Sequence, residues 1–207
     1  MKIERFVLGK VQTNCYLIQN EETKEVLIVD PAVCPDYLLG HIKSKGMIPT
    51  AILLTHGHFD HIMGIDGWLA EYAIPVYLFE KEKEIIENPQ SNLSGMVGES
   101  YAFSGATYTK EGENLQLAGF EIEVIHTPGH TIGSCSYYFK KEKIVVTGDT
   151  LFCREVGRSD LPTGNGAVLE KSIREKLYIL PDETVVYPGH DDESSIGYEK
   201  THNPYVR

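Results

Sequence analysis

Histidine and aspartate are concentrated in one short segment of this chain. The sequence THGHFDH, residues 55–61, places three of the eight histidines and one aspartate within six consecutive positions. His56 and His58 are two residues apart, so both imidazoles of an extended or turning segment can face one point, while Asp60 and His61 can reach a second point nearby. Neutral imidazole and carboxylate are favoured ligands of zinc and iron. The segment therefore predicts metal coordination.

Three further candidate ligands lie downstream, each after a run of β-type residues. They are His130 in HTPGHT, Asp149 in TGDT and His190 in YPGHDD, and a Pro-Gly pair directly precedes each of the two histidines. Any one of these side chains alone is more simply explained as a packed or solvated residue. The repeated strand-and-turn context of the whole set of seven favours a metal site. The remaining histidines are expected to be solvated or packed, and they are His41, His126 and His202.

The candidate ligands fall where predicted strands end. Apolar or alternating runs predict strands at residues 3–8, 14–19, 24–30, 51–55, 113–117, 120–126, 134–139, 143–149 and 183–190. Helical spacing predicts helices at residues 35–46, 62–73, 79–88 and 166–180, and the composition of residues 89–112 predicts a long surface loop. Strands followed by helices, twice along the chain, predict two α/β halves whose sheets are covered by helices. Such a scaffold usually carries its site in the loops after its strands.

Composition and charge exclude several classes of partner. A chain of 207 residues with 42% hydrophobic and 24% charged residues predicts one globular domain, residues 1–207. The net charge of −11, without a basic run longer than two residues, argues against nucleic acid. No apolar stretch reaches the roughly 18–20 residues of a membrane span and no secretory signal begins the chain, so we expect no membrane partner and a cytoplasmic location. The four dispersed cysteines are expected to be free thiols.

The order of these motifs resembles that of a known family. The pattern T-H-x-H-x-D-H followed by G-H, G-D and G-H, from Thr55 to His190, is similar to the signature of the metallo-β-lactamase superfamily. The resemblance implies an α/β fold, a four-layer α-β-β-α sandwich with two metal ions at one edge of its sheets. It assigns His56, His58 and His130 to the first ion, Asp60, His61 and His190 to the second, and Asp149 to a bridging position.

A pair of metal ions at this site would generate a nucleophile. Two dications about 3.5–4 Å apart repel each other, so bridging anions such as Asp149 and a hydroxide are needed between them. Two metals, the carboxylates of Asp60 and Asp149, and one hydroxide leave a charge of about +1, which can attract an anionic or carbonyl substrate. Metal binding lowers the pKa of water to roughly 7, so hydroxide is available near neutrality. We expect two Zn²⁺ ions per chain, with iron or manganese as alternatives, and a catalytic role for Asp60.

Longer motifs narrow the branch of the family. The resemblance implies that true β-lactamases lack the bridging Asp149, and that the diiron flavoprotein branch carries a carboxylate where this chain has His58. Residues 148–164, GDTLFCREVGRSDLPTG, and residues 188–205, PGHDDESSIGYEKTHNPY, are similar to hydroxyacylglutathione hydrolases of the glyoxalase II type, particularly the short bacterial ones. We therefore expect hydrolysis of a small-molecule thioester, by a chain without the C-terminal helical domain of the longer enzymes.

The GRSD segment departs from the longer enzymes of that type. Where they carry a lysine and a tyrosine for a glutathione carboxylate, this chain has Arg158 and, two residues on, Asp160. Arg158 can pair with a carboxylate through two hydrogen bonds, which makes it a candidate substrate contact. Asp160 would repel the same carboxylate, and the simpler interpretation is that it caps the loop or pairs with Arg158 itself.

Two other functions remain open on the sequence alone. A persulfide dioxygenase of the same superfamily would bind one iron through His56, His58 and Asp149, a two-histidine, one-carboxylate triad. A non-catalytic metal-binding module is the other, although structural zinc sites are usually closed by four ligands. The acyl group of the substrate and the oligomeric state are not determined by the sequence.

Overall fold

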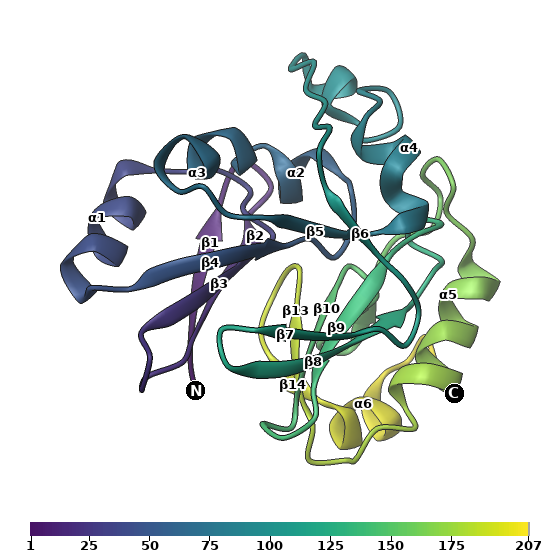
Figure 1. The fold of residues 1–207 in the computed structure, drawn as a ribbon. Helices are drawn as coiled ribbons and strands as arrows, with labels where there is room; N and C mark the ends of the chain where they lie inside the picture. Colours follow the sequence, from purple (N-terminus) through teal and green to yellow (C-terminus); the bar gives the residue numbers. More distant parts are fainter. Residues whose placement is uncertain (207) are drawn as a thin grey trace.

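The first half of the chain folds into a six-stranded sheet (Figure 1). The computed structural model describes residues 1–206. The strands lie side by side in chain order and are β1 (Lys2–Leu8), β2 (Thr13–Gln19), β3 (Glu25–Val29), β4 (Ile48–Leu53), β5 (Val76–Phe79) and β6 (Thr107–Thr109). The first three are antiparallel, and β3 to β6 run parallel. Parallel pairs need crossover connections, which is why helices follow β3 and β4.

The second half forms another six-stranded sheet. Its order is β14-β13-β10-β9-β8-β7, with only β10 and β13 parallel. These strands are β7 (Asn114–Leu117), β8 (Phe120–His126), β9 (Cys135–Phe139), β10 (Ile144–Gly148), β13 (Val185–Pro188) and β14 (Ser194–Ser195). A small hairpin after β10 consists of β11 (Leu151–Phe152) and β12 (Glu155–Val156).

Helices cover the outer face of each sheet. In Figure 1, α1 and α3 lie over the first sheet, and α5 and α6 lie over the second. The helices are α1 (Asp36–Lys45), α2 (Phe59–Ile62), α3 (Ile65–Glu71), α4 (Lys83–Ile86), α5 (Gly166–Ser172) and α6 (Ile196–His202). Short 3₁₀ segments are η1 (Glu80–Glu82) and η2 (Ser94–Val97), and the π-helical segment η3 (Ile173–Leu177) continues α5. Within residues 1–206, no helix has the length and apolar character to span a bilayer.

Three apolar cores separate these four layers. In β2, Leu17 packs toward α1 and α3, whereas Tyr16 and Ile18 pack between the two sheets. The outer face of the second sheet packs against α5 and η3, as Val145 does with Leu169. Because both faces of the central strands are buried, these strands read as continuous apolar runs rather than as alternating patterns. The predicted four-layer α-β-β-α sandwich is confirmed.

Three predicted boundaries were wrong. The helix predicted at residues 62–73 is two helices, α2 and α3, because the Gly64 N–H donates to the Pro31 carbonyl over 2.8 Å instead of to a carbonyl of the preceding helical turn. The helix predicted at 79–88 begins later, because Phe79 still belongs to β5. Residues 89–112 are not simply a surface loop, since they contain η2, β6 and the buried Asn92. The asparagine amide donates to the carbonyls of Ile86 and Tyr101 and so closes this segment.

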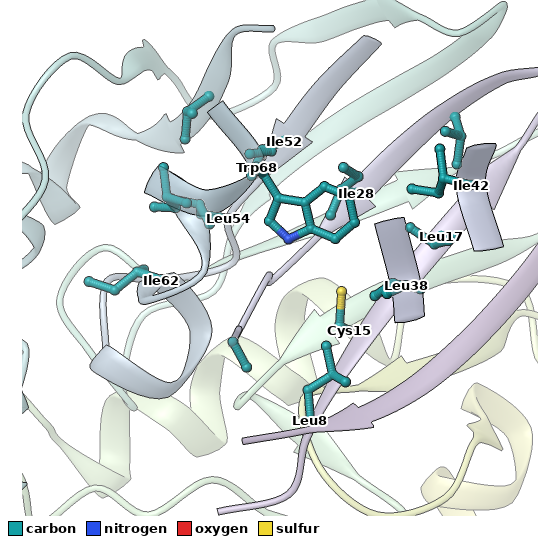
Figure 2. Close-up of a cluster of buried hydrophobic side chains, with 14 of the residues drawn as sticks. Leu8, Cys15, Leu17, Ile28, Leu38, Ile42, Ile52, Leu54, Ile62 and Trp68 are labelled. Carbon is teal, nitrogen blue, oxygen red and sulfur yellow. The ribbon is translucent and has the colours of Figure 1, made fainter. Parts of the chain in front are cut away.

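Trp68 of α3 is the centre of the core beneath the first helical layer. Figure 2 shows its indole beside Ile28, Ile52 and Leu54, and its side chain is fully buried. We expect Trp68→Ala to lower the free energy of unfolding by about 3–5 kcal/mol, because a large cavity would remain. Urea unfolding followed by circular dichroism measures this loss.

The matched control is Ile179→Ala, at a side chain that is 74% exposed. It should change the free energy of unfolding by no more than about 0.5 kcal/mol. Equal stability losses in the two variants would contradict the packing described for Trp68.

Candidate metal centre

The seven side chains predicted as ligands lie together at one edge of the two sheets. His56 and His58 follow β4, while Asp60 and His61 lie on the short helix α2. The other three follow strands of the second sheet, β8, β10 and β13, and they are His130, Asp149 and His190. The sequence anticipated that they follow strands, but it placed Asp60 and His61 in a loop rather than on a helix.

Close backbone packing explains why glycine precedes Asp149 and His190 in the G-D motif and the last G-H motif. A Cβ on Gly189 would lie 2.2 Å from Asp149 Oδ1, and a Cβ on Gly148 would lie 2.3 Å from Thr55 Oγ1. Gly148 also has a φ of 51°, in the left-handed region that side chains disfavour. Only glycine therefore lets the backbone approach closely enough to bring Asp149 and His190 to the loop after β4.

The first group of donors consists of three buried imidazoles. One ring nitrogen from each of His56, His58 and His130 lies within 4.8 Å of the others. The closest approach is 2.9 Å, between His58 Nδ1 and His130 Nε2. His130 Nδ1 lies 2.7 Å from the Arg158 carbonyl oxygen, so this nitrogen carries the proton and leaves Nε2 free to act as a donor to a metal.

The second group consists of Asp60, His61 and His190. Asp60 Oδ2 lies 3.4 Å from His61 Nε2 and 3.4 Å from His190 Nε2. The hydroxyl of Thr13 donates to the same carboxylate oxygen over 2.8 Å, which fixes its orientation. The first residue of β2 therefore contributes to the position of a residue that follows β4.

Asp149 lies between the two groups. Its Oδ1 is 3.4 Å from His61 Nε2, and its Oδ2 is 3.5 Å from His130 Nε2 and 3.6 Å from His190 Nε2. One donor each from His56, His61 and Asp149 also fall within 4.8 Å of one another. A single carboxylate thus faces donors of both groups.

Several donor atoms in this cluster have no hydrogen-bond partner among the described residues. They include the Nε2 atoms of His56 and His61 and the Oδ1 atom of Asp149, all buried. Buried polar atoms are normally paired, because desolvation without a partner is unfavourable by about 1–3 kcal/mol for each group. Nitrogen and oxygen lone pairs that converge in this way are the donor set of a divalent metal, so the residues present fit such ions.

The carboxylates of the cluster also need positive charge beside them, either from metal ions or from protonated histidines. Burial, followed by the neighbouring imidazoles, lowers the pKa of His58 to about 3, so this imidazole is neutral. Burial opposes ionisation of Asp149, yet His61, His190 and His130 hold its pKa at about 2. In His190 the carboxylates of Asp149 and Asp60 outweigh burial and raise the pKa to about 10. Without metal, protons on the histidines therefore balance the carboxylates.

Asp30 supports the site, and the sequence analysis missed it. It follows β3, and its Oδ1 accepts from the Thr55 backbone N–H over 2.8 Å. Its Oδ2 accepts from the Thr55 hydroxyl over 2.7 Å and lies 3.0 Å from His61 Nδ1. The hydrogen bond to Asp30 orients His61 so that its Nε2 faces Asp60 and Asp149. The only signal in the sequence was one aspartate at the end of an apolar run.

Glu82 was also missed, and it connects two loops that carry histidines. Its Oε2 accepts from the Gly57 N–H over 2.7 Å, between His56 and His58. Its Oε1 accepts from the Thr131 hydroxyl over 2.6 Å and from the Gly133 N–H over 2.8 Å, just after His130. Burial raises the pKa of Glu82 to about 7, against these three hydrogen bonds, which lower it.

Five of the seven candidate ligands line a cavity of about 310 Å³, and they are His58, Asp60, His130, Asp149 and His190. Arg158 lines it as well, but its guanidinium is paired with Asp160, with Nε–Oδ1 and Nη2–Oδ2 distances of 2.8 Å. The interpretation that Asp160 pairs with Arg158 is confirmed. The remaining histidines lie elsewhere: His126 stacks on Phe79, and His41 and His202 lie outside the cluster.

We expect Glu82→Gln to lower the free energy of unfolding by about 1–3 kcal/mol and to weaken zinc binding. Glutamine replaces one of the two carboxylate oxygens with an NH₂ group, which donates and cannot accept. This NH₂ group would face an N–H or O–H group that now donates to Glu82, so at least one buried hydrogen bond would be lost. Urea unfolding and competition with a zinc chelator measure the two effects.

The control is Glu84→Gln, at an exposed glutamate two residues further on. It should shift stability by no more than about 0.5 kcal/mol and leave zinc affinity as in the wild type. If Glu82→Gln also left both quantities unchanged, Glu82 would not connect the histidine loops.

Comparisons with known proteins agree with this geometry. The profile of the metallo-beta-lactamase superfamily matches residues 8–190. A "Probable metallo-hydrolase YqgX" from Bacillus subtilis is 40% identical, over 100% of this chain and 98% of its own length. The "Hydroxyacylglutathione hydrolase GloC" of Haemophilus influenzae is 34% identical, again over 100% of this chain and 98% of its own.

Solved structures share the whole fold. The BLEG-1 B3 metallo-beta-lactamase has a TM-score of 0.93 at 38% identity and covers 99% of each chain. TTHA1623, solved in a di-iron-bound form, has a TM-score of 0.86 at 33% identity and covers 98% of this chain and 100% of its own. Together with the His/Asp cluster, these similarities imply divalent metal ions at the site.

Proposed function

This chain belongs to the metallo-beta-lactamase superfamily, and on that premise we propose that it is a dinuclear metallo-hydrolase of thioesters such as S-2-hydroxyacylglutathione. The observation that carries the proposal is the position of Asp149, which faces both groups of donors. Similarity to a hydroxyacylglutathione hydrolase supports the thioester. We propose Zn²⁺ as the metal, and the di-iron form of TTHA1623 keeps iron as an alternative.

The proposed ligand set uses all seven side chains. His56, His58 and His130 would hold one ion, Asp60, His61 and His190 the other, and Asp149 both. When bound, the ions would polarise a carbonyl and lower the pKa of water toward about 7. The chain's own contribution is to orient these donors, through Thr13 on Asp60, Asp30 on His61 and the Arg158 carbonyl on His130.

A thioester suits the residues around the cavity. Its leaving group is a thiolate, and a thiol has a pKa of about 8.5, so the sulfur can depart without a proton donor. The carboxylates that line the cavity are Asp60 and Asp149, and both have pKa values held below the usual range by neighbouring histidines. Neither can donate a proton near neutrality, which disfavours substrates with a poor leaving group.

Arg158 remains a proposed contact for an anionic part of the substrate. It lines the cavity, but a substrate carboxylate would have to replace Asp160 as its partner. Exposed ion pairs are worth about 0–1 kcal/mol, so that exchange is energetically feasible.

The mononuclear iron site of a persulfide dioxygenase has less support. Within residues 1–206, the predicted triad of His56, His58 and Asp149 does not gather within 4.8 Å. The two-histidine, one-carboxylate group that does gather is His56, His61 and Asp149, and its carboxylate also faces His130 and His190. The measurement for that alternative is oxygen uptake with glutathione persulfide by the iron-loaded protein.

A second candidate function is β-lactam hydrolysis, which the similarity to BLEG-1 favours. The bridging position of Asp149 argues against it, because the resemblance implies that true β-lactamases lack this aspartate. We therefore expect kcat/KM for nitrocefin to be at least about 100-fold below that for S-lactoylglutathione, a difference of about 2.8 kcal/mol in transition-state stabilisation. The reverse order would make β-lactam hydrolysis the main activity.

Removal of a residue that only supports a metal ligand lowers activity by up to about 100-fold. Because Asp60 is proposed to bind a metal directly, we expect Asp60→Ala to reduce kcat/KM for S-lactoylglutathione by more than about 100-fold. The assay follows thioester loss in zinc-loaded protein. Asp36→Ala, at an exposed aspartate in the first turn of α1, is the control and should keep wild-type turnover. Wild-type turnover no faster than that of Asp60→Ala would reject this substrate class.

A further inference from the structure

A second cavity, of about 260 Å³, opens beside the metal centre. We call it the side cavity. Asp60, a proposed metal ligand, lines both the side cavity and the cavity of the metal centre, as do Val11, Phe59 and Val97. The two cavities therefore adjoin at these four residues, so the side cavity lies next to the site where a substrate would meet the metals.

The wall of the side cavity is apolar. Its apolar residues are Val11, Ala32, Val33, Phe59, Met63 and Val97, from the β1–β2 loop, the segment after β3, α2 and η2. Val11 is 46% exposed, Val33 37% and Val97 45%. Single exposed apolar side chains are ordinary, but a group of them around one hollow beside a reactive centre is typical of a ligand-binding site.

Every lysine or arginine that lines the cavities around the centre already has a carboxylate partner. The pairs are Arg5–Asp192, Lys10–Glu99 and Arg158–Asp160, with N–O distances of 3.0, 2.9 and 2.8 Å. A carrier thiol with carboxylates, such as glutathione, would have to displace one of these partners to gain an ionic contact. Discrimination by the charge of the thiol should therefore be weak.

We propose that the side cavity receives an apolar acyl chain, so that the protein selects thioesters by their acyl group rather than by their thiol. This inference rests on the thioesterase function proposed above. The cavity volume of about 260 Å³ is several times the roughly 30 Å³ that one water molecule occupies in the liquid, so the cavity has room for an acyl chain of several methylenes. Hydrolysis adds one water across the C–S bond and releases the carboxylate, a proton and the free thiol.

A series of substrates that differ only in acyl length tests the inference. With S-acetyl-, S-butyryl- and S-hexanoylglutathione, kcat/KM should rise by roughly threefold to fourfold for each added methylene that enters the cavity. Butyryl thioesters of glutathione, coenzyme A and N-acetylcysteamine should have values within roughly tenfold of one another. The inference would be overturned if kcat/KM did not change with acyl length, or if it differed more among the three thiols than among the three acyl groups.

Variants assign the effect to the side cavity. Val33→Ser and Met63→Ser remove apolar surface at residues that line the side cavity but not the cavity of the metal centre, and each should lower the ratio of hexanoyl to acetyl kcat/KM by about threefold or more. Ile179→Ser removes an exposed apolar side chain that lines neither cavity and should keep the wild-type ratio. If the cavity variants also kept that ratio, the acyl chain would bind elsewhere.

Binding of the products separates this inference from the proposed function. Calorimetry with zinc-loaded protein should show hexanoate binding more tightly than acetate, with a negative heat-capacity change from apolar burial. If no thioester is hydrolysed but hexanoate shows this preference, the proposed function fails and the side cavity remains an acyl site. If thioesters are hydrolysed but neither rate nor binding depends on chain length, only the inference about the cavity fails.

Discussion

The metal centre depends on one largely buried carboxylate, Asp149, whose negative charge needs a positive charge beside it. Asp149 lies among five imidazoles and one other carboxylate, and its Oδ1 has no hydrogen-bond partner among the described residues. Burial of such a group is unfavourable unless a positive charge compensates it. In the metal-free protein, protonated histidines such as His190 supply that charge. Two divalent ions would supply it more completely, because the same carboxylate faces both groups of donors.

A second layer of interactions gives this cluster its geometry. Asp30 connects the ends of β3 and β4 to His61, and Glu82 connects the histidine loops of the two halves of the chain. Both carboxylates are buried, and both accept from backbone N–H groups as well as from side chains. The cluster is thus held by the backbone of several loops, each fixed at the end of a strand by the packed sheets beneath it.

Much of the site could be predicted from the sequence because its motifs are contiguous. THGHFDH places four donors in one segment, and Gly148 and Gly189 mark positions where the backbone approaches the cluster too closely for a side chain. Asp30 and Glu82 could not be predicted, because each is a single carboxylate whose partners lie at least 25 residues away in sequence. The side cavity was equally hidden, since its wall comes from four separate segments. Nine strands of the two sheets were predicted from their apolar or alternating runs, whereas β5, β6 and β14 were missed because each is only two to four residues long. The break at Gly64 could not be predicted because it depends on a tertiary contact with Pro31.

The most direct test of the central claim is anomalous diffraction from crystals grown with zinc, measured on both sides of the zinc absorption edge. The account predicts two peaks about 3.5–4 Å apart, with Asp149 between them and His56, His58 and His130 around one. A single peak, or none, with the Asp149 carboxylate turned away from the histidines, would contradict it.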